Sequence, residues 1–290
     1  MQMTVQGTDL TTCRLWAITP DYLKAIKAGR IAADAATWAA RGKGRMAGEI
    51  AVIPVMGVLT QRGSWYGMSL ESIRAVFREK MADPAVKAIV FEYDTPGGEV
   101  YGIEELSAEF RAAKGVKPTV GHFNPLSASA GYYLGAQHDV VMITPSGEGG
   151  SVGVYAMHAD WSGYLDQAGI SVTLVSAGEG KTAANMFEPL SEEAKSDMQL
   201  DVDRYYGMFV SAVAKGRKAA GITADKVRDE WKAKVYGAKE AVAIGMADEV
   251  GTLDDALRRA ARLAQDAGGS LAIADAQFEM RRKARERQTS

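Results

Sequence analysis

The sequence predicts an α/β fold, and two observations carry this prediction. Short, almost continuously apolar runs of strand length alternate along residues 48–190 with amphipathic segments of helix length. Apolar strands without polar alternation are typical of a parallel sheet covered by helices on both faces. After Pro189 the pattern becomes helical. We therefore expect βαβ units around a mostly parallel sheet, followed by a helical C-terminal part.

Each element follows from its local pattern. The predicted strands are Ala51–Leu59, Ala88–Tyr93, Pro118–Phe123, Val140–Thr144 and Val172–Val175. The predicted helical segments are Pro20–Gly29, Leu70–Met81, Gly102–Ala113, Ala128–Ala136, Ser191–Lys218, Thr223–Lys232, Ala238–Ile244 and Leu253–Ala267. Ser191 followed by Glu192 and Glu193 marks the start of the long helix, because acidic residues stabilise a helix N-terminus.

The pattern divides the 290 residues into an N-terminal extension (1–47), a core (48–257), and a C-terminal helix with a basic tail (258–290). A net charge of −2 gives no reason to expect nucleic acid as a partner. The single cysteine, Cys13, excludes an intrachain disulfide and a multi-cysteine metal site. No run reaches the ~18 apolar residues of a membrane span, and no secretory leader pattern is present. We expect a soluble, cytoplasmic protein with no membrane anchor, metal or cofactor.

Three short motifs carry candidate chemistry. Pro96–Gly98 follows the predicted strand Ala88–Tyr93, where glycine lets the backbone approach a ligand. Ser129 stands among small residues where a helix begins, so backbone N–H groups would lie beside its hydroxyl. Lys181 lies among Gly and Ala, where a desolvated lysine can accept a proton. Taken singly, each motif also fits a structural role: a tight turn, a helix cap and a surface lysine.

The order of the motifs is more specific than any one of them. P-G-G, then S-A-G-Y-Y from Ser129, G-S-V-G-V at Gly150–Val154 and G-K-T-A at Gly180–Ala183 resemble the signal peptide peptidase A family of serine peptidases (family S49). That family includes head-maturation proteases of tailed phages. Val235–Gly251 also resembles the family's closing motif. The resemblance covers residues 48–257 and implies a Clp- and crotonase-like core.

The resemblance implies a Ser–Lys dyad, with Ser129 as nucleophile and Lys181 as general base. Ser151 matches the family serine that orients the lysine amine, and the N–H groups of Gly98 and Ala130 match the oxyanion hole. At Ala130 the chain departs from the family, which usually has glycine after the nucleophile. The remaining candidates, expected to contact substrate, are Gly97 and Gly131.

Three alternatives stay open. A Ser–His–Asp triad would have to use His122, His138 or His158, and of these only His158 lies near the position at which Clp peptidases place their histidine. A crotonase-type acyl-CoA enzyme would use paired backbone N–H groups but would not explain Ser129 and Lys181 together. A non-enzymatic capsid-assembly protein could share the fold.

The resemblance also implies partners. The opening Leu15–Pro20 and the Gly- and Ala-rich run after it are similar to phage capsid peptidases, whose substrates are scaffold or portal-associated proteins inside the prohead. The alternative is a soluble bacterial peptidase that degrades peptides. Family members assemble as homo-oligomers, and we expect one here. Ser129 and Lys181 would then come either from one chain or from neighbouring chains.

Overall fold

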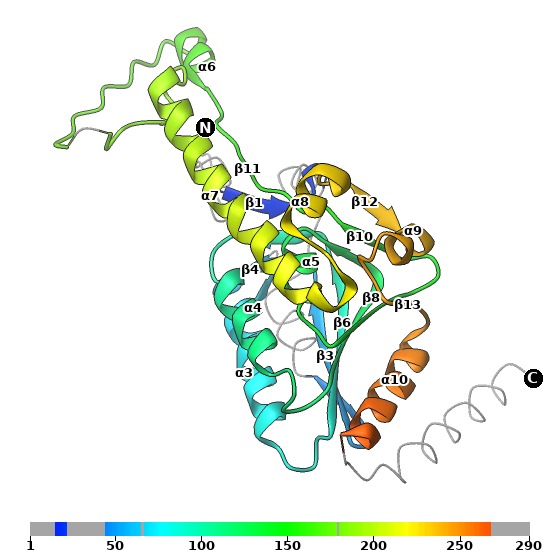
Figure 1. Ribbon diagram of the computed structural model, residues 1–290. Coiled ribbons are helices and arrows are strands. Elements are labelled where there is room, and N and C mark those ends of the chain that lie inside the picture. Colours follow the sequence, from blue (N-terminus) through cyan, green and yellow to red (C-terminus); the bar gives the residue numbers. More distant parts are fainter. Residues whose placement is uncertain (1–14, 22–43, 65–66, 179, 268–290) are drawn as a thin grey trace, which may run out of the picture.

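A mostly parallel sheet lies at the centre of the structure, a computed structural model that describes residues 15–21, 44–64, 67–178 and 180–267 (Figure 1). Among these residues the sheet runs in the order β12-β10-β8-β6-β3-β2, and β9 and β13 extend it beside β8. Its strands are β2 (Arg45–Ala47), β3 (Ile50–Met56), β6 (Ala88–Thr95), β8 (Thr119–Ala128), β9 (Val140–Ile143), β10 (Glu148–Gly150), β12 (Val235–Gly237) and β13 (Glu249–Val250). The central strands pair in parallel, and only β2 and β12 are antiparallel at the edges. The predicted fold class is confirmed.

A second, smaller sheet runs in the order β11-β1-β7-β4-β5. Its strands are β1 (Leu15–Ile18), β4 (Val58–Thr60), β5 (Gly67–Ser69), β7 (Gly97–Glu99) and β11 (Tyr155–Ala156). Gly57, in the left-handed region at φ +68°, turns the chain from β3 into β4, so the predicted strand Ala51–Leu59 divides between the two sheets.

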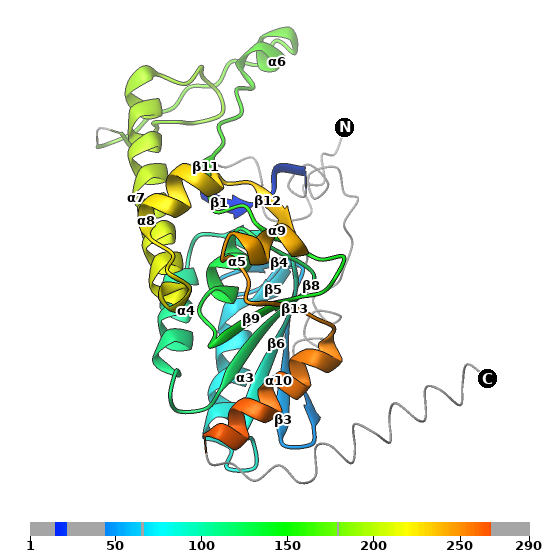
Figure 2. The same ribbon diagram turned by 45° about the vertical axis from the view of Figure 1, so that its right-hand side comes forward.

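Helices cover both faces of the central sheet (Figure 1). The α-helices of the described residues are α3 (Leu70–Ala82), α4 (Ile103–Ala112), α5 (Ala130–Gly135), α6 (Ser162–Gln167), α7 (Glu192–Gly216), α8 (Ala224–Lys226), α9 (Ala238–Ala243) and α10 (Leu253–Asp266), of which α6 lies apart from the sheet. On one face Phe77 of α3 and Phe110 of α4 pack on Phe91 of β6. On the other face α10 lies over β3 and β6 (Figure 2), and the buried alanines of α10 belong to one apolar cluster with Val52 and Val90.

Most predicted helices lie within one or two residues of their observed bounds. The Ser191 hydroxyl accepts a hydrogen bond from Ala194 N at 3.1 Å and caps α7, as the sequence indicates. The predicted helix Thr223–Lys232 instead consists of α8 and a π-helical turn, Val227–Trp231. The prediction of a strand at Val172–Val175 is wrong, because this segment has no strand beside it and Val175 is 93% exposed.

The segment 157–190, which we call the arm, projects from the body and carries α6 (Figures 1 and 2). Its outgoing and returning halves contact each other: Trp161 N donates to Met186 O at 2.8 Å, and His158 is hydrogen-bonded to Asn185 O at 2.7 Å. Large apolar side chains are exposed along it: Trp161, Tyr164, Ile170, Val172, Leu174 and Val175.

Some sequence predictions fall wholly or partly outside the described residues. The predicted helix Pro20–Gly29 is described only at its first two residues, and the basic tail not at all. The division into three segments stays a prediction. In the structure β1 and β2, from the predicted extension, pair with core strands, and α10 continues across the boundary at residues 257 and 258. In the described part of the chain, no helix is long and apolar enough to cross a membrane.

Candidate active site

Ser129 occupies a sharp turn between β8 and α5. Its backbone has φ +54° and ψ −119°, a region that non-glycine residues rarely adopt and that persists only where neighbouring contacts enforce it. Two hydrogen bonds do so here: Ser129 N donates to Gly150 O at 2.7 Å, and Tyr133 N donates to Ser129 O at 2.9 Å. Among the described residues, the hydroxyl makes only a long contact, 3.5 Å, to Gly153 O. The backbone is therefore held firmly, while the hydroxyl of this buried residue has no strong hydrogen bond within the part of the chain that the structure describes.

The P-G-G turn reaches the same place from the neighbouring strand. Ser129 follows β8 and Gly97 follows β6, and the carboxyl ends of parallel strands meet at one edge of a sheet. A Cβ placed on Gly97 would lie 2.9 Å from Ser129 Cβ and 3.0 Å from Ala130 N. Gly97, at φ +100°, therefore has no room for a side chain, and the turn approaches Ser129 because the residue is glycine.

Two backbone N–H groups near Ser129 are candidate oxyanion donors. Ala130 is the first residue of α5, and the N–H of a first helical residue has no carbonyl partner within its helix. The N–H of Gly97 donates to Thr95 Oγ1 at 3.1 Å, so of the two glycines Gly98 is the better candidate. A Cβ on Gly98 would overlap the backbone of Leu59, which shows how tightly β7 is packed there.

Ser151 lies close to Ser129, and Gly131 has a packing role. Gly150 pairs with Ala128 in the β8–β10 ladder, so the next residue, Ser151, stands beside the turn of Ser129. Ser151 has φ +56° and its N–H donates to Lys234 O at 2.7 Å. A Cβ on Gly131 would overlap the side chain of Thr95, so this glycine allows α5 to pack on β6.

Lys181 does not reach Ser129 within a single chain. It lies in an exposed turn of the arm, where Ala183 N donates to Gly180 O at 3.0 Å. Figures 1 and 2 show that the arm leads away from the body and from α5.

The three histidines have structural partners of their own. His122 Nε2 is hydrogen-bonded to Gly251 O at 3.0 Å, and burial lowers its pKa. His138 is hydrogen-bonded to the Tyr93 hydroxyl at 2.7 Å, and His158 lies on the arm. The structure therefore does not support a Ser–His–Asp triad at Ser129.

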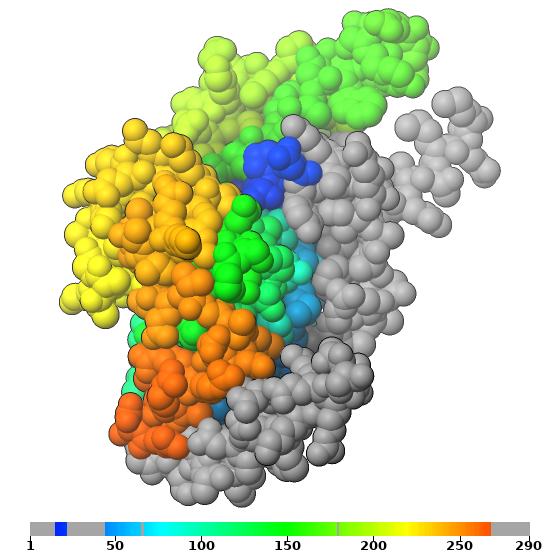
Figure 3. Space-filling model, turned by 90° about the vertical axis from the view of Figure 1, so that its right-hand side faces the viewer, coloured from blue at the N-terminus to red at the C-terminus, as the bar shows by residue number. Residues whose placement is uncertain are grey.

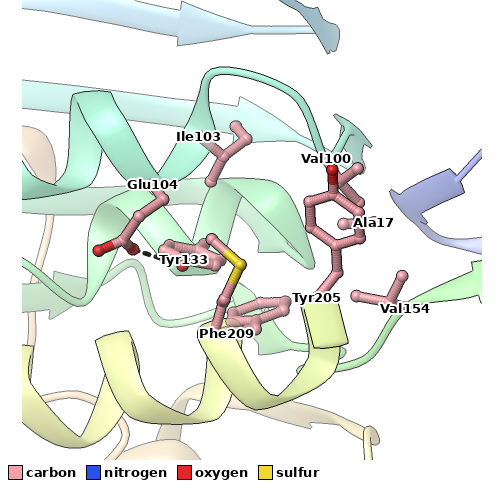
Figure 4. Close-up of a pocket in the computed structure, with 9 residues that line it drawn as sticks. Ala17, Val100, Ile103, Glu104, Tyr133, Val154, Tyr205 and Phe209 are labelled. Carbon is pink, nitrogen blue, oxygen red and sulfur yellow. Dashed lines mark hydrogen bonds between the residues drawn. The ribbon is translucent and has the colours of Figure 1, made fainter. Parts of the chain in front are cut away.

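An apolar pocket (Figure 4) lies near Ser129, because its lining includes Tyr133 of α5 and Val154, which follows Gly153. Its lining comes from β1, the start of α4, α5, the chain after Gly153, and α7. The lining residues are Ala17, Val100, Ile103, Glu104, Tyr133, Val154, Tyr205, Met208 and Phe209. At one end the Tyr133 hydroxyl donates to Glu104 Oε2 at 2.6 Å, and burial together with this bond raises the pKa of Tyr133.

Sequence reasoning missed several contributors to this site. Thr95 directly precedes the P-G-G motif, and its hydroxyl donates to Gly57 O at 2.6 Å while accepting from Gly97 N, which fixes the turn. The position of Thr95 directly before the motif is the sequence feature that could have identified it. Nothing local indicates that Tyr205 and Phe209, on α7, would close a pocket next to Ser129.

A serine on an enforced strand-to-helix turn, with backbone amides beside it, is typical of hydrolases that form an acyl-enzyme. Residues 111–266 match the model of peptidase family S49, and the chain belongs to this family, as its motifs predict.

Relatives of the chain include phage proteins. It is 31% identical to the head-tail preconnector protein GP5 of Enterobacteria phage P21, over 73% of this chain and 43% of that protein. It is 30% identical to the capsid assembly protease C of Escherichia phage lambda, over 72% of this chain and 48% of that protein. The chain is also 32% identical to a putative protease of Methanocaldococcus jannaschii, over 63% of this chain and 58% of that protein. The chain thus spans less than half the length of the two phage relatives.

Proposed function

We propose that the chain is a serine endopeptidase that uses Ser129 as nucleophile and Lys181 as general base. The observation that carries the proposal is the close approach of the Gly97 turn to Ser129 and Ala130 N, which leaves no room for a Cβ on Gly97. Ser151 is the positioning residue for the lysine amine, and the N–H groups of Ala130 and Gly98 stabilise the oxyanion.

The reaction follows from these roles. Neutral Lys181 takes the hydroxyl proton as Ser129 Oγ bonds to the peptide carbonyl carbon, and the backbone N–H groups hold the oxygen as it gains charge. The carbon–nitrogen bond breaks when the lysine gives that proton to the leaving amine. Water then attacks the ester, with the lysine again accepting a proton, and Ser129 is restored.

The dyad is completed between two copies of the chain. A lysine serves as base only when its surroundings disfavour the charged form, and Lys181 in its own chain is exposed. The exposed apolar side chains of the arm would be covered by packing on a neighbouring copy. The same contact would bring Lys181 to that copy's Ser129 and bury it, as the expected homo-oligomer requires.

The proposed substrates are scaffold or portal-associated proteins processed during phage head maturation. This assignment is supported by the two phage relatives, one of which is a capsid assembly protease. The protein would then act in the host cytoplasm or inside the prohead. If it is instead a general peptidase, it would hydrolyse unfolded proteins such as casein with no preference for capsid components.

Mixing inactive variants tests both the residues and their sharing. Ser129→Ala and Lys181→Ala should each abolish hydrolysis of casein, whereas Lys195→Ala, which alters another exposed lysine, should not. Random co-assembly of the two inactive chains should restore roughly a quarter of the wild-type activity, because about one site in four draws both intact residues from different copies. Inactive mixtures would exclude sharing, and an active Ser129→Ala protein would exclude the proposed function.

A further inference from the structure

The N-terminal strand β1 lies between two strands that border the candidate active site. It pairs antiparallel with β7, which contains Gly97 and Gly98, and with β11, which begins two residues after Gly153. All four residues of β1 are buried. Figure 3 shows the segment 15–21, in blue, at the surface of the body next to a part of the chain in green, the colour that the bar gives near residue 150.

The register of β1 places one carbonyl on the proposed oxyanion donor. Thr19 N donates to Pro96 O at 3.0 Å, so Thr19 and Pro96 form a hydrogen-bonded pair of the ladder. Such pairs alternate with non-bonded pairs along an antiparallel ladder. Ile18 and Gly97 are therefore a non-bonded pair, and Ala17 and Gly98 exchange both bonds. The Ala17 carbonyl thus accepts the N–H of Gly98.

The same carbonyl lies next to the nucleophile. A Cβ placed on Gly97 would overlap the Ala17 carbonyl oxygen, and that Cβ would be 2.9 Å from Ser129 Cβ and 3.0 Å from Ala130 N. One small region of space is thus bordered by the Ala17 carbonyl, the nucleophilic serine and the second proposed oxyanion donor.

The side chain of Ala17 lines the apolar pocket (Figure 4). Tyr133, one turn after Ser129, and Val154, next to Gly153, line it as well, so the pocket adjoins the nucleophile. A substrate residue that precedes a cleaved bond needs its carbonyl at the oxyanion donors and its side chain in a neighbouring pocket. Ala17 has both.

We propose that Leu15–Ile18 occupies the peptide-binding groove of the active site as a built-in, substrate-like strand, with Ala17 in the position before the bond to be cleaved. This rests on the proposed function of Ser129. External peptides bind by the same addition of a strand between β7 and β11, so they must displace β1 first.

The same geometry defines the peptides that compete best. The groove takes an extended segment bonded through its main chain on both sides, because β7 and β11 each pair with β1. Tyr205 and Phe209 of α7 close the pocket around the Ala17 methyl group. Alanine or a similarly small apolar residue is therefore favoured before the cleaved bond. A tethered strand has a high effective concentration, which keeps weak peptides out.

The test uses the full chain carrying Ser129→Ala, so it does not depend on catalysis. Binding of a fluorescein-labelled peptide, Leu-Trp-Ala-Ile-Thr, is followed by polarisation. Ala17→Arg puts a long charged side chain where the pocket holds a methyl group and should expel β1, tightening peptide binding about tenfold or more. Ala219→Arg is the control, since it makes the same substitution at an exposed alanine outside the groove, and it should leave binding unchanged. Equal binding by Ala17→Arg and the control protein, or no binding to either, would overturn the proposal.

Hydrogen exchange provides a second readout that needs no change in β1. Saturating peptide should accelerate exchange of the Ala17 and Thr19 amides in the Ser129→Ala chain if the peptide displaces β1. Peptide binding without such acceleration would show that β1 is a permanent strand and would overturn the proposal, even if Ala17→Arg fails to fold. The proposed function is judged separately, by casein hydrolysis in the chain with Ser129 intact.

Discussion

Ser129 and Gly150 are joined by a hydrogen bond of 2.7 Å from the serine amide to the glycine carbonyl. This bond connects the turn that carries the proposed nucleophile to the G-S-V-G-V motif. It also determines where Ser151 lies, because Ser151 directly follows Gly150 and is held from its other side by Lys234 O. Two motifs that are separate in the sequence therefore form one rigid unit.

Replacement of Ser151 tests its proposed role in positioning the lysine amine. Ser151→Ala should lower kcat about tenfold to a hundredfold, part of what a well-placed general base contributes, with little change in KM. The pH at which activity is half-maximal should move upward, because the neutral lysine amine loses the hydroxyl that donates a hydrogen bond to it. Ser171→Ala, an exposed serine of the arm, is the control. Lower activity with an unmoved pH profile would point to a merely structural role for Ser151.

Gly97 allows a measurement of how closely the P-G-G turn must approach Ser129. Gly97→Ala would place a methyl group against the Ala17 carbonyl oxygen, Ser129 and Ala130 N and also strain a backbone at φ +100°, so both kcat and the melting temperature should fall. The backbone strain alone costs about 1–3 kcal/mol. Gly115→Ala separates the two effects, because Gly115 has φ +82° but no atom within 4 Å of the added Cβ. The Gly115→Ala variant should therefore lose stability but keep its activity. Equal loss of activity in both variants would contradict the close approach.

The central elements could be predicted from sequence because their patterns are local. The run Ala88–Tyr93 and the amphipathic segment Leu70–Met81 show their own period, and parallel strand order then brings the ends of β6 and β8 together. That order places Gly97 and Ser129 at the same edge of the sheet.

Features that depend on distant partners could not be predicted. Leu15–Ile18 is a short apolar run, and nothing within it indicates that β7 and β11 would enclose it. Val172–Val175 has the composition of a strand, but composition does not supply a neighbouring edge, and in the structure this segment is exposed. The location of Lys181 away from Ser129 depends on that same arm.

The pair Arg217–Asp248 should be important for stability. Arg217 has a side chain only 4% exposed and donates to both carboxylate oxygens of Asp248, at 2.6 and 2.8 Å. Asp248 also accepts from Val141 N at 2.7 Å and so attaches the closing motif to β9. Asp248→Ala would leave a buried guanidinium without its counter-ion, at a cost of about 3 kcal/mol in the free energy of unfolding.

An exposed pair provides the comparison. Asp201 and Arg204 lie on the surface of α7, with side chains 53% and 61% exposed. Asp201→Ala should therefore cost less than about 1 kcal/mol. Urea unfolding of the two variants measures the difference. Equal destabilisation would show that the burial of Arg217 carries no special cost.

His138 should make the free energy of unfolding depend on pH. Burial, and to a lesser degree the charge of Lys114, lowers the pKa of His138 from 6.5 to about 3. The folded state thus keeps this ring neutral, while the unfolded chain binds a proton below about pH 6.5. The stabilisation is complete above that pH and is lost as the pH falls from 6.5 towards 3, by about 1.4 kcal/mol for each pH unit.

His138→Gln removes this titration, although the variant is less stable at pH 7.5 because it loses the stacking of His138 on Phe91. Urea unfolding at pH 7.5 and pH 5 should show the difference between wild type and variant shrinking by about 2 kcal/mol. His122 titrates in both proteins and cancels from that difference, so curves that fall in parallel would mean that His138 becomes protonated without unfolding.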